Sequence, residues 1–141
     1  MKVCVVGTGA IGGCVGGFLA RAGIDVVFVA RGNHLAALRD RGLTIEAPSG
    51  SQQVAVHATD RLSELADIDL ALLCTKTYDN AALAPALGAL LSPRGVVLTL
   101  QNGLDPRDSL RGAVDPARVL VGIPFILAEL TAPGARSVPT R

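Results

Sequence analysis

The first hydrophobic run and the glycine-rich segment after it decide the fold. Residues 3–12 read Val-Cys-Val-Val-Gly-Thr-Gly-Ala-Ile-Gly. Four consecutive apolar residues at 3–6 are typical of a strand that is buried on both faces of a sheet. The glycines after them mark a turn, and residues 10–22 are predicted to form a helix that ends at Gly23. A strand, a glycine turn and a helix in this order indicate the start of a βαβ unit.

The turn carries the pattern G-x-G-x-x-G, formed by Gly7, Thr8, Gly9, Ala10, Ile11 and Gly12. Between a strand and a helix, this pattern predicts a dinucleotide-binding loop, although a purely structural glycine turn is the alternative. Gly7 allows the tight turn, Gly9 leaves room for a pyrophosphate, and Gly12 lets the helix pack close to the sheet. The phosphates are expected to meet free N–H groups at the positive end of the helix dipole.

The end of the second strand indicates which dinucleotide binds. Enzymes that use NAD place an acidic residue there, where it accepts a hydrogen bond from the ribose 2′-OH. Here the strand at residues 26–30 is followed by Arg31, and Asp25 lies at its start, too early to reach the ribose. A guanidinium is suited to a 2′-phosphate, and Asn33 with the Gly32 amide adds donors. NADP is therefore the expected cofactor, with a solvated loop arginine as the alternative.

Strand and helix patterns alternate along the rest of the chain, which predicts an α/β fold: a Rossmann-like, doubly wound, mostly parallel sheet with helices on both faces. Asn33 is the expected N-cap of the second helix. The domain is expected to span residues 1–134 and to lack its last strands, with a frayed tail at 135–141. Further strands are expected at 68–74, 96–100 and 119–123, helices at 34–41, 80–91 and 105–111, a helical turn at 62–66, and a hairpin or pair of edge strands at 43–46 and 54–57.

Two polar segments follow predicted strands, at the edge of the sheet where ligands of parallel α/β folds bind. Lys76 is a cation that would attract an anionic substrate or a cofactor phosphate, although a solvated loop lysine would look the same in sequence. Asn102 offers a donor and an acceptor that could orient a carboxamide, a ribose or a hydroxyl. Asn102-Gly103 is also an ordinary turn pair.

Composition excludes several classes of protein. Of 141 residues, 50% are hydrophobic and 18% charged, which argues against a disordered chain. The net charge of +1 with only 3% aromatic residues argues against a nucleic-acid-binding surface. Three dispersed cysteines indicate reduced thiols in a cytoplasmic protein and no metal site. The glycines within the uncharged stretch at residues 3–20 argue against a membrane span.

As a set, these motifs resemble the N-terminal domain of the ketopantoate reductase (2-dehydropantoate 2-reductase) family over about residues 1–134. The matching features are the glycine motif, Arg31, Lys76 in Leu-Cys-Thr-Lys-Thr, and Gln101-Asn102-Gly103-Leu104. The resemblance implies that NADPH reduces a 2-keto acid, giving pantoate on the way to coenzyme A. It also implies that the glycines hold the pyrophosphate, that Arg31 holds the 2′-phosphate, and that Lys76 and Asn102 line the nicotinamide and substrate side as the catalytic candidates.

The sequence also differs from those of the family in its length. Its members continue into a helical C-terminal domain that supplies the main catalytic lysine, and the sequence stops at Arg141 before such a domain. The expectation is therefore a truncated chain, a fragment or a split subunit that supplies the cofactor domain, with self-association or a second chain completing the site. The alternatives are a non-catalytic NAD(P)-binding regulatory module and a reductase of another keto acid.

Overall fold

A computed structural model describes residues 1–48, 50–102 and 107–138. The predicted helix at 105–111 and the motif residues Gly103 and Leu104 therefore lie partly or wholly outside the described residues, as do the last three residues of the tail. No helix in the described part of the chain is long and apolar enough to cross a membrane.

The core is a six-stranded sheet in the order β5-β2-β1-β6-β7-β8, in which every neighbouring pair is parallel. This arrangement confirms the predicted doubly wound, parallel sheet. Central strands such as β1 are continuous apolar runs because both of their faces are covered: the Val3–Val6 side chains are at most 1% exposed. The strands are β1 Lys2–Val6, β2 Asp25–Val29, β5 His57–Thr59, β6 Ile68–Leu73, β7 Leu91–Thr99 and β8 Val119–Val121.

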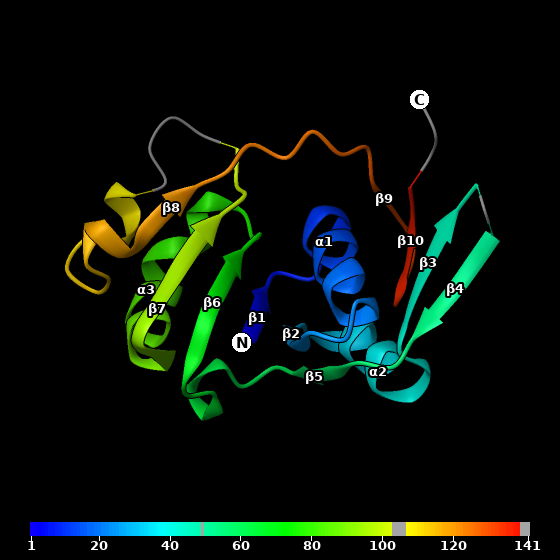
Figure 1. Ribbon diagram of the computed structural model, residues 1–141, viewed down its shortest axis with the longest axis horizontal. Helices are drawn as coiled ribbons and strands as arrows, with labels where there is room; N and C mark the ends of the chain where they lie inside the picture. The colour runs from blue at the N-terminus through cyan, green and yellow to red at the C-terminus, as the bar shows by residue number, and fades with distance from the viewer. Residues whose placement is uncertain (49, 103–106, 139–141) are drawn as a thin grey trace.

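Helices cover both faces of this sheet (Figure 1). Alternate residues of β1 point to opposite faces. Val3 and Val5 belong to a buried cluster with residues of β2 and α2, whereas Cys4 and Val6 belong to a second cluster with residues of α3. The helices are α1 Ala10–Arg21, α2 Gly32–Arg41 and α3 Asn80–Leu90, with 3-10 turns η1 Leu62–Glu64, η2 Thr77–Asp79, η3 Asp108–Leu110 and η4 Pro116–Arg118.

A second sheet, of which the sequence predicts only a hairpin or a pair of edge strands, lies beside α1 (Figure 1). Its order is β4-β3-β10-β9, and its strands are β3 Leu43–Ala47, β4 Gly50–Val54, β9 Glu129–Ala132 and β10 Ala135–Ser137. The β3–β4 pair is antiparallel and confirms the hairpin. The predicted second strand at 54–57 was placed too late, because β4 ends at Val54 and His57 begins β5 in the main sheet.

The expectation of a frayed segment from residue 135 is wrong for residues 135–137. They form β10, which pairs in parallel with β3 and antiparallel with β9. The sequence of this strand is polar and short, so its pairing depends on β3, which lies about ninety residues earlier in the chain. Arg136, the central residue of β10, is 0% exposed.

Candidate active site

The glycine loop connects β1 to α1, and its three motif glycines have different surroundings. Gly7 has φ +96°, and a Cβ there would lie 2.6 Å from the Thr75 backbone nitrogen. A Cβ on Gly12 would collide with the Gly7 carbonyl and lie 2.9 Å from the Cys74 Cβ. A Cβ on Gly9 would meet nothing within 4 Å. Packing therefore requires Gly7 and Gly12, whereas Gly9 faces open space.

A hydrogen bond holds the glycine loop at Thr8, and helix α1 begins directly after Gly9. The buried Thr8 hydroxyl donates to the Val29 carbonyl at 2.8 Å, which ties the loop to the end of β2. Gly9 is the N-cap of α1, and Ala10 and Ile11 are its first residues. N–H groups in the first turn of an α-helix have no partner within the helix. The loop therefore presents amide donors next to the space that Gly9 leaves open.

That space belongs to a hollow of about 360 Å³, here called the first hollow. Arg31, His34 and the glycine loop line it, together with side chains from the ends of neighbouring strands. Arg31 is exposed and is the N-cap of α2, so the structure brings it to the same hollow as Gly7, Thr8 and Gly9. The predicted N-cap at Asn33 is wrong: α2 begins at Gly32, and Asn33 lies exposed in its first turn.

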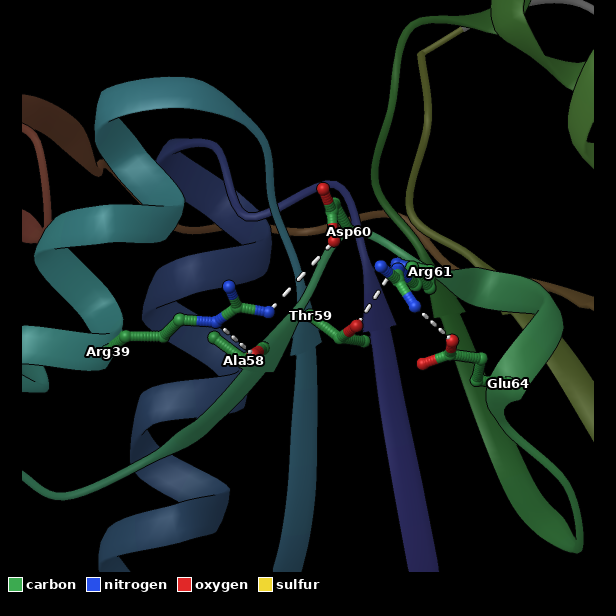
Figure 2. Close-up of polar contacts among 6 residues, drawn as sticks. All are labelled: Arg39, Ala58, Thr59, Asp60, Arg61 and Glu64. Carbon is green, nitrogen blue, oxygen red and sulfur yellow. Dashed lines mark hydrogen bonds and ion pairs between the residues drawn. The ribbon is translucent and has the colours of Figure 1, made fainter.

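The position of α2 relative to the sheet is held near its other end (Figure 2). The Arg39 Nε donates to the Ala58 carbonyl in β5 at 3.0 Å, and its guanidinium lies 4.0 Å from the Asp60 carboxylate. Exposed ion pairs of this kind contribute little stability on their own. The hydrogen bond nevertheless fixes the helix against the edge strand, and so helps to place Arg31 beside the end of β2.

A second hollow, of about 250 Å³, lies beyond β6 and β7. It is lined by Ile11, residues 74–78 and residues 100–102, so Lys76 and Asn102 share it. Both side chains are exposed. Thr75 lines both hollows, which places the two on either side of the same strand end. The glycine loop, Arg31, Lys76 and Asn102 therefore lie along one edge of the sheet, whereas Asn33, which was also predicted to bind the cofactor, lines neither hollow.

A buried polar network supports the second hollow, and most of its residues carry no signal in the sequence. The Gln101 amide nitrogen donates to the Asn80 side-chain oxygen at 2.7 Å and to the Thr75 carbonyl at 2.8 Å. The Asn80 amide donates back to Gln101 at 3.0 Å. Asn80 is 0% exposed and begins α3. These bonds fix the segments that carry Lys76 and Asn102; only Gln101, inside the quoted motif, was visible as a signal.

Two further residues next to the loop were also missed. His34 lines the first hollow, and its Nδ1 accepts a hydrogen bond from the Gly134 N–H at 2.9 Å. The buried Arg136 donates from Nε to the Gly9 carbonyl at 2.8 Å. A single arginine in a polar tail carries no local sequence signal for burial.

The described residues offer neither a reactive thiol at the second hollow nor a cluster of metal ligands. Burial raises the pKa of the Cys74 thiol, beside the second hollow, to about 12. A thiol with this pKa is protonated at neutral pH and is a poor nucleophile. No group of three or more His, Cys, Asp or Glu side chains in the described ranges is arranged to hold a metal ion.

Comparison with known proteins gives one consistent result. Residues 3–138 match the family described as "Ketopantoate reductase PanE/ApbA". A 2-dehydropantoate 2-reductase of Halobacterium salinarum is 40% identical over 137 residues, which are 95% of this chain and 45% of that protein. Its counterpart from Pyrococcus abyssi is 37% identical over 115 residues, covering 78% of this chain and 36% of that one.

Solved structures agree with the sequence matches. A ketopantoate reductase of Ralstonia eutropha JMP134 superposes with a TM-score of 0.87 at 36% identity, over 98% of this chain and 46% of the other. A 2-dehydropantoate 2-reductase of Geobacter metallireducens GS-15 gives a TM-score of 0.90 at 27% identity, over 100% and 47%. The chain thus spans less than half the length of these relatives. Its sequence and fold together place it in the ketopantoate reductase PanE/ApbA family.

Proposed function

We propose that this chain forms the NADPH-binding part of a reductase that converts 2-dehydropantoate to pantoate. The observation that carries the proposal is the arrangement of two hollows on either side of one strand end, with the glycine loop and Arg31 at the first and Lys76 and Asn102 at the second. Because Thr75 lines both hollows, one extended ligand such as a dinucleotide can reach from the first to the second. The names of the relatives supply the substrate.

The residues present fit a dinucleotide. The open space at Gly9 accommodates a diphosphate without collision, and the first-turn amides of α1 supply donors for its oxygens. Arg31 supplies a guanidinium at the start of α2, where it pairs with a 2′-phosphate through charge-assisted hydrogen bonds. Among the described residues that line the first hollow, Asp79 is the one acidic side chain, and it comes from η2 and not from β2. These features favour NADPH over NADH.

The second hollow fits the reacting end. When bound, the reduced nicotinamide supplies the hydride that a keto carbon accepts. The Lys76 ammonium provides positive charge for the carboxylate or the keto oxygen of a 2-keto acid, and Asn102 offers a donor and an acceptor to orient the nicotinamide ribose or the substrate. The hydrogen bonds of Gln101 to Asn80 and to the Thr75 carbonyl hold the backbone segments that carry Lys76 and Asn102 in place.

The test is substrate binding to the nucleotide complex. With NADP⁺ present, we expect 2-dehydropantoate to bind wild-type chain and Lys76→Met to weaken that binding about tenfold, the size of one charge-assisted contact. Lys2→Met, which removes a lysine at the opposite end of the sheet, is the matched control. Equal affinity of Lys76→Met and wild type would contradict the role of Lys76. A regulatory nucleotide-binding module, the alternative, would bind NADP⁺ but not the keto acid.

A further inference from the structure

The buried guanidinium of Arg136 lies directly behind the glycine loop. It comes from β10, and the described residues leave it 0% exposed. Its Nε donates to the Gly9 carbonyl at 2.8 Å, its Nη2 donates to the Thr8 carbonyl, and its Nη1 donates to the carbonyl of Ala135 at 3.1 Å. The absent side chain of Gly13 makes room for it, because a Cβ there would collide with the guanidinium.

This cation has no anionic partner in the part of the chain that the structure describes. Its hydrogen-bond partners are neutral carbonyls, and none of the ion pairs found among those residues includes it. The other titratable groups beside it are Cys14 and His34. Burial raises the pKa of Cys14, which keeps that thiol neutral. Burying a charge without a counter-charge is costly, and it lowers the pKa of Arg136 to about 10.

His34 cannot compensate the charge. Its Nδ1 accepts from the Gly134 N–H, so a neutral imidazole carries its proton on Nε2. The Arg136 Nη2 lies 2.6 Å from that Nε2, which in this tautomer offers no lone pair to the guanidinium. Burial, and next the charge of Arg136, lower the pKa of His34, and its hydrogen bond with the Thr8 backbone acts in the opposite direction. The guanidinium therefore retains its positive charge beside a neutral imidazole.

The charge is placed where it acts on the first hollow. His34 lines that hollow, so the guanidinium lies one side chain behind its wall. The carbonyls of Thr8 and Gly9 belong to the same peptide units as the N–H groups of Gly9 and Ala10. A cationic donor on a carbonyl oxygen polarises the peptide and strengthens its N–H as a donor. It also fixes the orientation of both peptide planes at the N-terminus of α1.

We propose that Arg136 is a positioning residue for the dinucleotide: it orients and polarises the two peptide units of the glycine loop, and the diphosphate is the counter-charge for its buried guanidinium. This inference rests on the proposed nucleotide-binding function. It also makes nucleotide binding and the docking of β10 interdependent, because one side chain links strand and loop across more than 120 residues of sequence.

Two substitutions in the 141-residue chain separate charge from hydrogen bonding. Arg136→Gln keeps an amide donor for the loop carbonyls and removes the charge, whereas Arg136→Lys keeps the charge. Titrations use NADPH and, as a probe without a diphosphate, adenosine 2′-monophosphate. We expect Arg136→Gln to lower the affinity for NADPH about tenfold, which is the scale of a charge interaction across a few ångströms of protein. The affinity of Arg136→Gln for adenosine 2′-monophosphate should change less than about threefold. Arg136→Lys should bind NADPH with an affinity within the same factor of wild type.

Ligand-free Arg136→Gln should unfold at a temperature no lower than wild type, because the uncompensated charge is gone. The proposal is overturned if Arg136→Gln binds NADPH as wild type does, if it loses affinity equally for both ligands, or if it fails to fold, since the charge would then serve the fold itself. Failure of wild type to bind NADPH would instead overturn the proposed function. Binding by wild type with no effect of Arg136→Gln would overturn only the role of Arg136.

Discussion

Substitution of Arg31 by alanine tests the recognition of the 2′-phosphate. A charge-assisted hydrogen bond contributes about 1.5–3 kcal/mol, and Arg31 is exposed at the start of α2, which favours the lower end of that range. Since about 1.4 kcal/mol corresponds to a tenfold change in affinity, we expect Arg31→Ala to lower the affinity for NADPH about tenfold. NADH carries no 2′-phosphate, so its affinity should change less than about twofold.

The assay is a fluorescence titration of each reduced nucleotide at one ionic strength, because exposed charges are screened by salt. Arg41→Ala is the matched control: it removes the same charge from the same helix, at a side chain that is 65% exposed and outside both hollows. The Arg31 side chain makes no capping hydrogen bond in α2, so the fold should be unaffected. Equal losses for NADPH and NADH, or an equal loss in Arg41→Ala, would refute the argument.

Three further substitutions test other parts of the account. Gly9→Val should abolish nucleotide binding and leave the melting temperature nearly unchanged, because its Cβ meets no protein atom within 4 Å. His34→Gln should flatten the loss of unfolding free energy below about pH 6.5, since the folded chain, with its lowered His34 pKa, excludes a proton that the unfolded chain binds. Phe125→Ser should reduce self-association in sedimentation velocity, because Phe125 is 83% exposed among neighbouring apolar side chains.

Gly12→Val is the matched control for Gly9→Val. Gly12→Val should unfold the chain, because its Cβ collides with the Gly7 carbonyl; equal behaviour of the two glycine variants would contradict the distinction between packed and open positions. An unchanged pH profile in His34→Gln would contradict the linkage between the pKa of His34 and stability. A wild-type chain that stays monomeric at high concentration would remove the basis for the Phe125 prediction.

The parallel sheet could be predicted from sequence because its strands are buried on both faces. Such strands appear as continuous apolar runs, as residues 3–6 of β1 and residues 70–73 of β6 do. The glycine loop could also be predicted from the sequence, because the backbone conformation at Gly7 and the close packing at Gly12 require glycine. The predicted N-cap of α2 was two residues too late. Asn33 is a good capping residue by type, but Arg31 is the N-cap and the helix begins at Gly32.

What could not be predicted depends on contacts between distant segments. Neither β10 nor the burial of Arg136 has a local signal, because both arise from pairing with β3 and from carbonyls of the glycine loop. Asn80 also lacks a local signal, because its burial depends on Gln101, which lies two residues beyond the end of β7. Short polar segments therefore gained their roles only from tertiary structure.

The central claim is that the loop at residues 9–12 binds a diphosphate. The most direct measurement is an NMR titration of ¹⁵N-labelled chain with NADPH, which follows the backbone amides individually. The account predicts the largest shifts at Gly9, Ala10 and Ile11, with further changes at Arg31. It would be contradicted if NADPH shifted no amide of the loop, or only those around the larger hollow of about 530 Å³ lined by residues 38–42 and Gln53.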